Sequence, residues 1–279
     1  MPFVWYFYQK QTTSSCYRVM NIRNVKDYAS YKLKSTKLIS IHSPFIYEVA
    51  SKVIYESGEY YSYSHIENIR KKWLNDNSSI SVNDFGAGSK IFKEGNRKVR
   101  DICKYSVKPK KHGQLLFRLI NFFQPKYILE LGTSLGLTTI YMASAARNSK
   151  VISIEGDYNT YLLAKKTVKL AKVRNVDLVN ARFQDVLPDL IDQCKQLDFV
   201  FIDGHHNKDA TLAYFELCLK KSHSETIFVF DDINWTAEMK EAWGIIKANS
   251  SITITIDLHT MGIAFLKEGI KKQHYLLNF

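Results

Sequence analysis

The pattern of apolar positions divides the chain near residue 113. After this point, seven short runs rich in apolar and β-branched residues are separated by segments with helical periodicity; the runs are YILEL, VISIE, VDLVN, DFVFID, TIFVFDD, ITITIDL and GIAFL. Strands that are apolar almost throughout and alternate with helices are typical of a parallel sheet that helices cover on both faces. Residues 113–279 therefore predict one α/β domain.

The residues before this domain predict helices. In HSPFIYEVASKVIYE, apolar side chains recur at helical spacing behind Ser43 and Pro44, residue types that are preferred at the N-cap and at the first helical position. SHIENIRKKWLND repeats the same spacing. We therefore expect a mainly helical region over residues 20–112, behind a flexible extension over residues 1–19.

Basic residues are concentrated in that helical region. The formal net charge is +12, and up to Lys126 there are 22 Lys and Arg against nine Asp and Glu, whereas the remainder is nearly neutral. A basic surface of this kind attracts nucleic acid, an anionic membrane surface or an acidic substrate. It is equally the ordinary solvated surface of a lysine-rich helical region, so the charge alone leaves both interpretations open.

The overall composition is that of an ordinary globular protein, with 46% hydrophobic and 24% charged residues. No apolar run approaches the roughly 18–20 residues that a transmembrane helix needs. The four cysteines show neither a CxxC pair nor metal-ligand spacing; they are Cys16, Cys103, Cys194 and Cys218. We therefore expect reduced thiols and a cytoplasmic location.

Two glycine turns compete as a cofactor-binding site: VNDFGAGSK at residues 82–90 and ILELGTSLG at residues 128–136. Such a turn needs a buried strand before it, a helix after it and an acid at the end of the next strand to hold ribose hydroxyls. The second turn meets all three conditions, since VISIE ends in Glu155, 23 residues after Gly132. The first turn follows a weak, polar strand and lacks the acid. We therefore place the cofactor at Gly132 and not at Gly86.

Four strand-end motifs, ELGTSLGLTT, IEGD, FIDGHHNKDA and FDDINW, follow one another in an order and spacing that resemble the class I S-adenosylmethionine-dependent methyltransferases. The resemblance covers roughly residues 114–266. It implies a Rossmann-like, doubly wound, seven-stranded sheet with a C-terminal antiparallel hairpin. A dinucleotide-binding oxidoreductase shares the first two motifs, but its turn normally carries G-x-G-x-x-G, which GTSLG does not match.

The resemblance implies a set of cofactor contacts. Backbone amides of the glycine turn would approach the methionine part of S-adenosylmethionine, and Glu155 would accept both ribose hydroxyls. Where many relatives carry an acid for the adenine amino group, this chain has Arg182, so adenine recognition is expected from the backbone or ring of the neighbouring Phe183. The expected cofactor residues are Glu130, Gly132, Thr133, Ser134, Gly136, Glu155, Gly156, Phe183 and Asp203.

Within this superfamily, FIDGHHNKDA and FDDINW are most similar to the small-molecule O-methyltransferases, including the divalent-cation-dependent catechol and caffeoyl type. By position, the resemblance implies Asp203, Asp231 and Asp232 as ligands of Mg²⁺ or another divalent cation, which would lower the pKa of a substrate hydroxyl and orient it. Strand-end carboxylates also cap helices or bind loop amides, and that alternative stays open.

The expected catalytic residues are Asp203, His205 and His206. One of the two histidines is placed where a general base would face the substrate; otherwise both are polar loop residues. We assign no catalytic role to the lysine runs at residues 108–111 and 271–272 or to the cysteines.

The leading hypothesis is an S-adenosylmethionine-dependent methyltransferase that acts on an oxygen of a small-molecule acceptor. The basic helical region would then form a substrate lid or a homodimer contact. A second hypothesis keeps the enzyme class and changes the acceptor to RNA or another polyanion, and a third is a cofactor-binding protein without catalysis. The unused glycine loop over Asp84–Ser89 is interpreted as a lid or substrate-side loop.

Overall fold

The computed structural model describes residues 22–83 and 95–279, with side chains from Tyr28 onwards. The expected extension over residues 1–19 and the glycine loop over Asp84–Ser89 lie outside the described residues, so both interpretations stay predictions.

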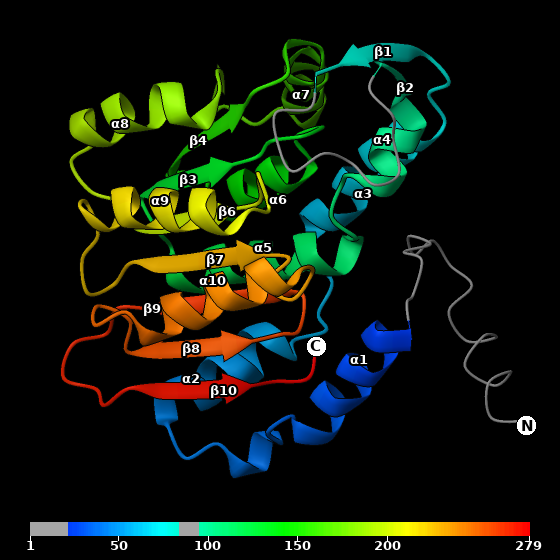
Figure 1. Ribbon diagram of the computed structural model, residues 1–279. Coiled ribbons are helices and arrows are strands. Elements are labelled where there is room, and N and C mark those ends of the chain that lie inside the picture. The colour runs from blue at the N-terminus through cyan, green and yellow to red at the C-terminus, as the bar shows by residue number, and fades with distance from the viewer. Residues whose placement is uncertain (1–21, 84–94) are drawn as a thin grey trace, which may run out of the picture.

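A mostly parallel sheet of eight strands forms the centre of the molecule, with helices on both faces (Figure 1). The strands stand in the order β10-β8-β9-β7-β6-β3-β4-β5, and every neighbouring pair is parallel except the two pairs that contain β9. The strands are β3 (Tyr127–Leu131), β4 (Lys150–Glu155), β5 (Val176–Asn180), β6 (Phe199–Ile202), β7 (Ile227–Asp231), β8 (Ile254–Asp257), β9 (Met261–Phe265) and β10 (Gln273–Leu276). The predicted doubly wound α/β fold with a C-terminal antiparallel hairpin, β8 and β9, is confirmed.

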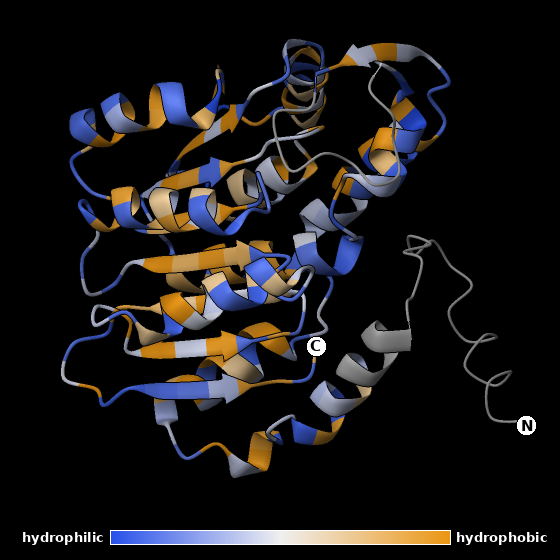
Figure 2. Ribbon diagram, viewed as in Figure 1, coloured by the Kyte–Doolittle hydropathy of each residue, from blue (hydrophilic) through white to orange (hydrophobic). Residues whose placement is uncertain are grey.

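Strand β10 is an addition to the seven strands that the sequence predicts. It pairs in parallel with β8 at the edge of the sheet, and its residues are exposed or half-buried. Figure 2 shows it in hydrophilic blue, in contrast to the orange strands of the interior. An edge strand with polar residues has no continuous apolar run, so its pairing is decided by the tertiary structure and not by local pattern.

Alternating residues of the central strands build two hydrophobic cores, one on each face of the sheet. In β6, Phe199 and Phe201 belong to the first core, and Val200 and Ile202 to the second. The helices that cover the first core are α2 (Pro44–Val49), the π-helical turn η2 (Ala50–Ile54), α5 (Lys110–Phe123) and α6 (Leu137–Ala145). The helices that cover the second core are α8 (Phe183–Gln193), α9 (Lys208–Leu219) and α10 (Ala237–Ala248). Strands buried on both faces explain the nearly continuous apolar runs of the sequence.

The region before the sheet is mainly helical, as expected, and shares a core with it. Ser43 caps α2 by accepting a hydrogen bond from the Ile46 N–H at 3.4 Å, while Ile46 packs in the first core. The predicted boundary between residues 112 and 113 falls inside α5. The remaining elements are α1 (Ile22–Lys34), the 3₁₀ turn η1 (Leu38–Ser40), α3 (Tyr61–Leu74), an antiparallel pair β1 (Ser79–Val82) and β2 (Gly95–Lys98), α4 (Val99–Tyr105) and α7 (Tyr158–Ala171).

The topology predicts a ligand-binding site at the carboxyl ends of β3 and β6. These two strands are neighbours, yet the helix after β3 covers the first core and the helix after β6 covers the second. Ligands of open α/β sheets bind outside the carboxyl ends of the strands where such a reversal occurs. The glycine turn follows β3, Glu155 and Asp231 are the last residues of β4 and β7, and Asp203 and Asp232 come directly after β6 and β7, so all lie at this edge.

Candidate cofactor and acid site

The turn after β3 is held against β4 by backbone hydrogen bonds. The Gly132 and Thr133 N–H groups donate to the Ile154 carbonyl at 3.1 and 3.2 Å. Gly132 and Gly136 have φ angles of 103° and 75°, in the left-handed region that favours glycine. The sequence prediction that these glycines form the turn is consistent with this geometry.

Gly132 also brings the glycine turn into contact with the end of β6. A Cβ atom at this position would lie 2.1 Å from the backbone oxygen of Asp203. We therefore expect Gly132→Ala to lower the free energy of unfolding by about 3 kcal/mol, because backbone strain and a backbone clash add. Chemical denaturation measures this, and Gly244→Ala is the matched control: no atom lies within 4 Å of its Cβ position inside α10. Equal stability of the two variants would contradict the prediction.

Glu155 ends β4 and faces the glycine turn. Its carboxylate accepts hydrogen bonds from the Ser134 N–H at 2.8 Å and from the Asp157 N–H at 3.0 Å. Burial raises the pKa of Glu155 to about 7, although the two backbone donors oppose this. Ser134 itself has a φ of 49°, so the turn is drawn toward the acid in an uncommon backbone conformation. Gly156, next in the chain, is half-buried beside it.

Glu130 lies inside the fold and supports the turn from behind. Its side chain is inaccessible, and it accepts hydrogen bonds from the hydroxyls of Thr138 and Ser153, both at 2.6 Å, and of Thr139. Glu130 was expected to contact the cofactor, but its carboxylate instead joins α6 to β4 through these hydroxyls. Thr133 joins the same network through the Ser153 hydroxyl at 2.6 Å.

The buried Glu130 makes stability depend on pH. Burial raises its pKa from 4.5 to about 7. Below pH 4.5 its contribution is fully present; as pH rises toward 7 the unfolded chain loses the proton that the native protein keeps, so the free energy of unfolding falls by up to about 1.4 kcal/mol per pH unit. Chemical denaturation at about pH 5, 6 and 7 measures the slope. Glu130→Gln should flatten it, leaving the part that Glu155 contributes; an unchanged slope would disprove the assignment.

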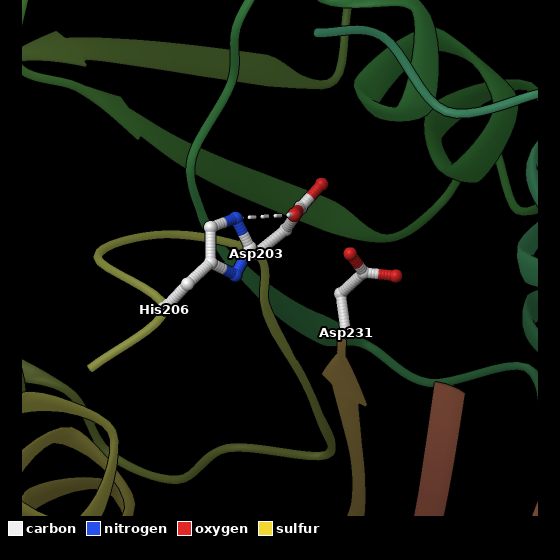
Figure 3. Close-up of side chains that lie close together, drawn as sticks. All are labelled: Asp203, His206 and Asp231. Atoms are coloured by element: carbon white, nitrogen blue, oxygen red, sulfur yellow. Dashed lines mark ion pairs between the residues drawn. The ribbon is translucent and has the colours of Figure 1, made fainter. Parts of the chain in front are cut away.

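The ends of β6 and β7 bring acids and a histidine together. Asp203, His206 and Asp231 each offer one ligand atom, and these atoms lie within 4.8 Å of one another. The His206 Nε2 atom is 3.8 Å from Asp203 Oδ1 and 4.0 Å from Asp232 Oδ2. Figure 3 shows the His206 ring turned toward Asp203, with Asp231 facing them from the neighbouring strand. We call Asp203, Asp231, Asp232 and His206 the acid centre.

A lysine from the helical region enters the acid centre. The Lys108 ammonium lies 3.0 Å from Asp203 Oδ1 and also contacts Asp231 Oδ2. Its side chain is 14% exposed, against 2% for Asp231. Burial alone would lower the pKa of Lys108, but the carboxylates of Asp203, Asp231 and Asp232 offset this and hold the pKa above its ordinary value. Sequence reasoning missed this residue, because within the run KPKKHG nothing separates it from surface lysines.

Three carboxylates and one ammonium leave an excess of negative charge in the acid centre. Burial raises the pKa of Asp203 well above its ordinary value; Asp231 and Asp232 add to this rise, and Lys108 opposes it. The site therefore attracts a further positive group.

The side chains of His205 and His206, between which the sequence did not distinguish, contact different groups. The His205 Nδ1 atom lies 3.1 Å from the Tyr214 hydroxyl, and its ring packs edge-on against Phe183. His206 faces the acid centre and packs edge-on against Trp235, with ring centroids 5.1 Å apart. Of the two histidines, His206 is thus the one that lies at the acid centre.

Left-handed backbone conformations of non-glycine residues gather at this edge of the sheet. Positive φ angles occur at Ser134 in the glycine turn, at His205 and His206 after β6, and at Asp232 after β7. Each such residue costs free energy and persists only where the surroundings enforce it. Strained conformations of this kind are common in loops that bind ligands, so they support the choice of this edge as the candidate site.

The packing of the Phe183 ring bears on the expected adenine contact. The Phe183 ring is 7% exposed and packs against His205 and Tyr214, and a Cβ on Gly204 would lie 2.4 Å from it. Of the two alternatives for adenine recognition, this burial favours the Phe183 backbone over the ring. Arg182 pairs with Asp185 at 2.8 Å on the surface.

The aspartates supply the oxygen chemistry that a divalent cation prefers. However, the oxygen atoms that would bridge an ion between Asp203 and Asp231 contact the Lys108 ammonium instead. The described arrangement does not fit a bridging ion unless Lys108 is displaced, and the metal assignment stays a prediction.

A doubly wound sheet with an antiparallel hairpin, a glycine turn at the switch point and an acid ending the next strand define the fold of class I S-adenosylmethionine-dependent methyltransferases. The predicted resemblance is confirmed: residues 129–233 match the model of a methyltransferase domain. The chain is 34% identical over 131 residues to a catechol O-methyltransferase of Niastella koreensis, covering 46% of this chain and 58% of the relative. It is 31% identical to the O-methyltransferase imqG of Aspergillus flavus, covering 39% and 45%. The chain thus spans less than two thirds of these relatives.

Solved structures share the fold. The O-methyltransferase TomG from Streptomyces achromogenes, in complex with SAM, has a TM-score of 0.52 at 20% identity, with 80% of this chain and 95% of that chain covered. An O-methyltransferase from Bacillus cereus, in complex with SAH, has a TM-score of 0.52 at 17% identity, with 78% and 94% covered.

Across the described residues, every helix is too short or too polar to cross a membrane. Three of the cysteines, Cys103, Cys194 and Cys218, carry free thiols.

Proposed function

We propose that this chain is an S-adenosylmethionine-dependent methyltransferase that transfers the methyl group to an oxygen of a small-molecule acceptor. The observation that carries the proposal is the contact between the glycine turn and the acid centre. The Gly132 Cα is so close to the Asp203 backbone that even a methyl group would not fit between them. A cofactor on the turn would therefore present its reactive end beside Asp203 and His206.

The chain's own residues account for the cofactor contacts. Glu155 would receive the two ribose hydroxyls, in exchange for one of the backbone donors that it now holds; its position facing the glycine turn supports this. The sulfonium of S-adenosylmethionine is positive, so the excess negative charge of the acid centre favours its approach. Glu130 and its three hydroxyl partners keep the turn in place from behind.

The transfer step needs a base and a positive partner for the acceptor oxygen. The acceptor O–H bond breaks as its proton passes to the Nε2 atom of His206. The oxygen lone pair then attacks the methyl carbon, the C–S bond breaks and its electron pair stays on sulfur. The products are the methyl ether, S-adenosylhomocysteine and a protonated His206, which Asp203 and Asp232 stabilise at 3.8 and 4.0 Å.

Two observations support a particular class of acceptor: the position of Trp235 and the activity of a relative. Trp235 packs against the base, His206, so a planar acceptor can lie beside an aromatic wall. The Niastella koreensis relative is a catechol O-methyltransferase. We propose a small phenolic or catechol-like acceptor.

Free thiols at the described cysteines support a reducing, cytoplasmic location. A homodimer contact and an RNA or polyanion acceptor stay predictions, although two basic residues of the N-terminal half, Arg97 and Arg118, are buried within the fold and Lys108 contacts the acid centre.

The experiment is a methyl-transfer assay with isotope-labelled S-adenosylmethionine and a panel of catechols, phenols and aliphatic alcohols, with products identified by mass spectrometry. A labelled methyl ether from a phenolic acceptor supports the proposal. Cofactor binding without transfer to any of the acceptors would favour the cofactor-binding protein without catalysis, and methylation of a generic RNA would favour the polyanion hypothesis.

A further inference from the structure

We infer that the Lys108 ammonium is the resident cation of the acid centre, in the place between Asp203 and Asp231 that a bridging divalent metal would take. The acid centre would then work without a divalent metal. The part of this inference that concerns turnover rests on the proposed function, whereas the part that concerns metal exclusion does not.

The first support is the position of the charge. Lys108 Nζ is at hydrogen-bond distance from Asp203 and in contact with Asp231. A Mg²⁺ ion that joined these carboxylates would sit about 2.0–2.1 Å from an oxygen of each. The ammonium occupies the same narrow space, so the two cations exclude each other.

The second support is that the backbone of Lys108 is anchored by a chain of partly buried polar groups. The Lys108 carbonyl accepts a hydrogen bond from Arg70 Nη1 at 2.9 Å. Arg70 Nε in turn donates to Glu67 Oε1 at 3.0 Å, and the Tyr141 hydroxyl donates to the same carboxylate at 2.8 Å. Helices α3 and α6 thereby fix the residue, and α5 begins two residues later. A loosely attached surface lysine would have no such support.

The third support is energetic. A buried carboxylate without a partner is strongly destabilising, and a lysine within the same chain is always available as that partner. A divalent ion would have to displace it and leave the ammonium without its two partners. A lysine ammonium also has three donors. The two aspartates take two of them, and the third can stabilise the negative charge that develops on the acceptor oxygen.

Metal binding tests the inference without any need for turnover. The probe is Mn²⁺, added to metal-stripped full-length protein and followed by calorimetry and electron paramagnetic resonance. We expect the wild type to show no saturable site. Lys108→Met removes the charge at similar length and should bind one Mn²⁺ per chain, at least about tenfold more tightly than any weak, non-saturable binding by the wild type. Stoichiometric, Asp231-dependent binding of Mn²⁺ to the wild type would overturn the inference.

Two further variants separate metal exclusion from general effects on charge. Lys110→Met is the matched control, because Lys110 is half exposed and its carboxylate partner, 3.8 Å away, is Glu59 and not the acid centre; it should behave as the wild type. Lys108→Met combined with Asp231→Asn should lose the new site. If Lys108→Met gains no Mn²⁺ site, or if Lys110→Met gains the same one, the inference is wrong.

Folding and turnover give independent readouts. If Lys108→Met is too unstable to isolate, its refolding yield should rise on addition of Mn²⁺, whereas that of the wild type should not; absence of this rescue counts against the inference. Once an acceptor is found, turnover of the wild type should survive excess EDTA, and loss of turnover that Mg²⁺ restores would overturn the inference. A failure to find any acceptor would count against the proposed function and leave the Mn²⁺ result decisive for Lys108.

Discussion

Glu155→Ala should weaken S-adenosylmethionine binding at least about 100-fold, because two hydrogen bonds from ribose hydroxyls to a buried carboxylate are lost together. The alanine also releases the Ser134 N–H that the carboxylate now holds at 2.8 Å, so the glycine turn loses its support. Calorimetric titration with S-adenosylmethionine measures the change.

Asp177→Ala is the control for Glu155→Ala. Asp177 lies on the neighbouring strand β5, is 64% exposed and pairs with Lys150 on the surface, so its removal should leave cofactor affinity unchanged. Since the Glu155 pKa is about 7, cofactor affinity of the wild type should also rise with pH up to about neutrality. Wild-type affinity in Glu155→Ala would refute the assignment of the ribose site and with it the choice of Gly132 over Gly86.

Asp203→Asn should lower the rate of methyl transfer by about 10²–10⁴-fold while leaving the protein folded. The amide keeps the shape of the side chain but loses the charge that holds Lys108 and that stabilises protonated His206. The effect should therefore appear mainly in kcat. Single-turnover kinetics with a labelled methyl group separates transfer from cofactor binding.

Asp192→Asn provides the reference for Asp203→Asn, because this exposed acid lies at the far end of α8 and touches no part of the acid centre. It should react as the wild type does. If Asp203→Asn transferred the methyl group at the wild-type rate, the acid centre would have no part in the chemistry, and a purely structural role at the end of β6 would remain.

Local patterns in the chain were sufficient for the fold. Strands β3, β4 and β6 to β9 were predictable because each is mostly buried in the sheet, which requires an almost continuous apolar run. The edge strand β5 is only exposed or half-buried, and its short run VDLVN was still recognisable. The glycine turn was predictable because positive φ angles at residues 132 and 136 favour glycine, and Glu155 because consecutive parallel strands end at the same edge of the sheet. Each of these signals depends on a residue and its near neighbours in sequence.

Other properties depend on which surfaces meet in three dimensions. Strand β10 forms only because β8 offers an edge to pair with. The separate roles of His205 and His206 depend on the φ angles of their loop and on the rings that receive them. The burial of the Glu130 carboxylate depends on hydroxyls from α6 and β4.

The acid centre shows most clearly which properties the sequence predicts and which depend on tertiary contacts. The three aspartates were predictable from their places at strand ends, because β6 and β7 are neighbours in the sheet. The ammonium that contacts two of them comes from a segment between α4 and α5, and Arg70 and Glu67 of α3 hold that segment in place. The sequence by itself determined the α/β fold, the glycine turn and the acids at the strand ends. Only the tertiary structure decided that Lys108 faces those acids, because its position depends on the packing of helices far away in sequence.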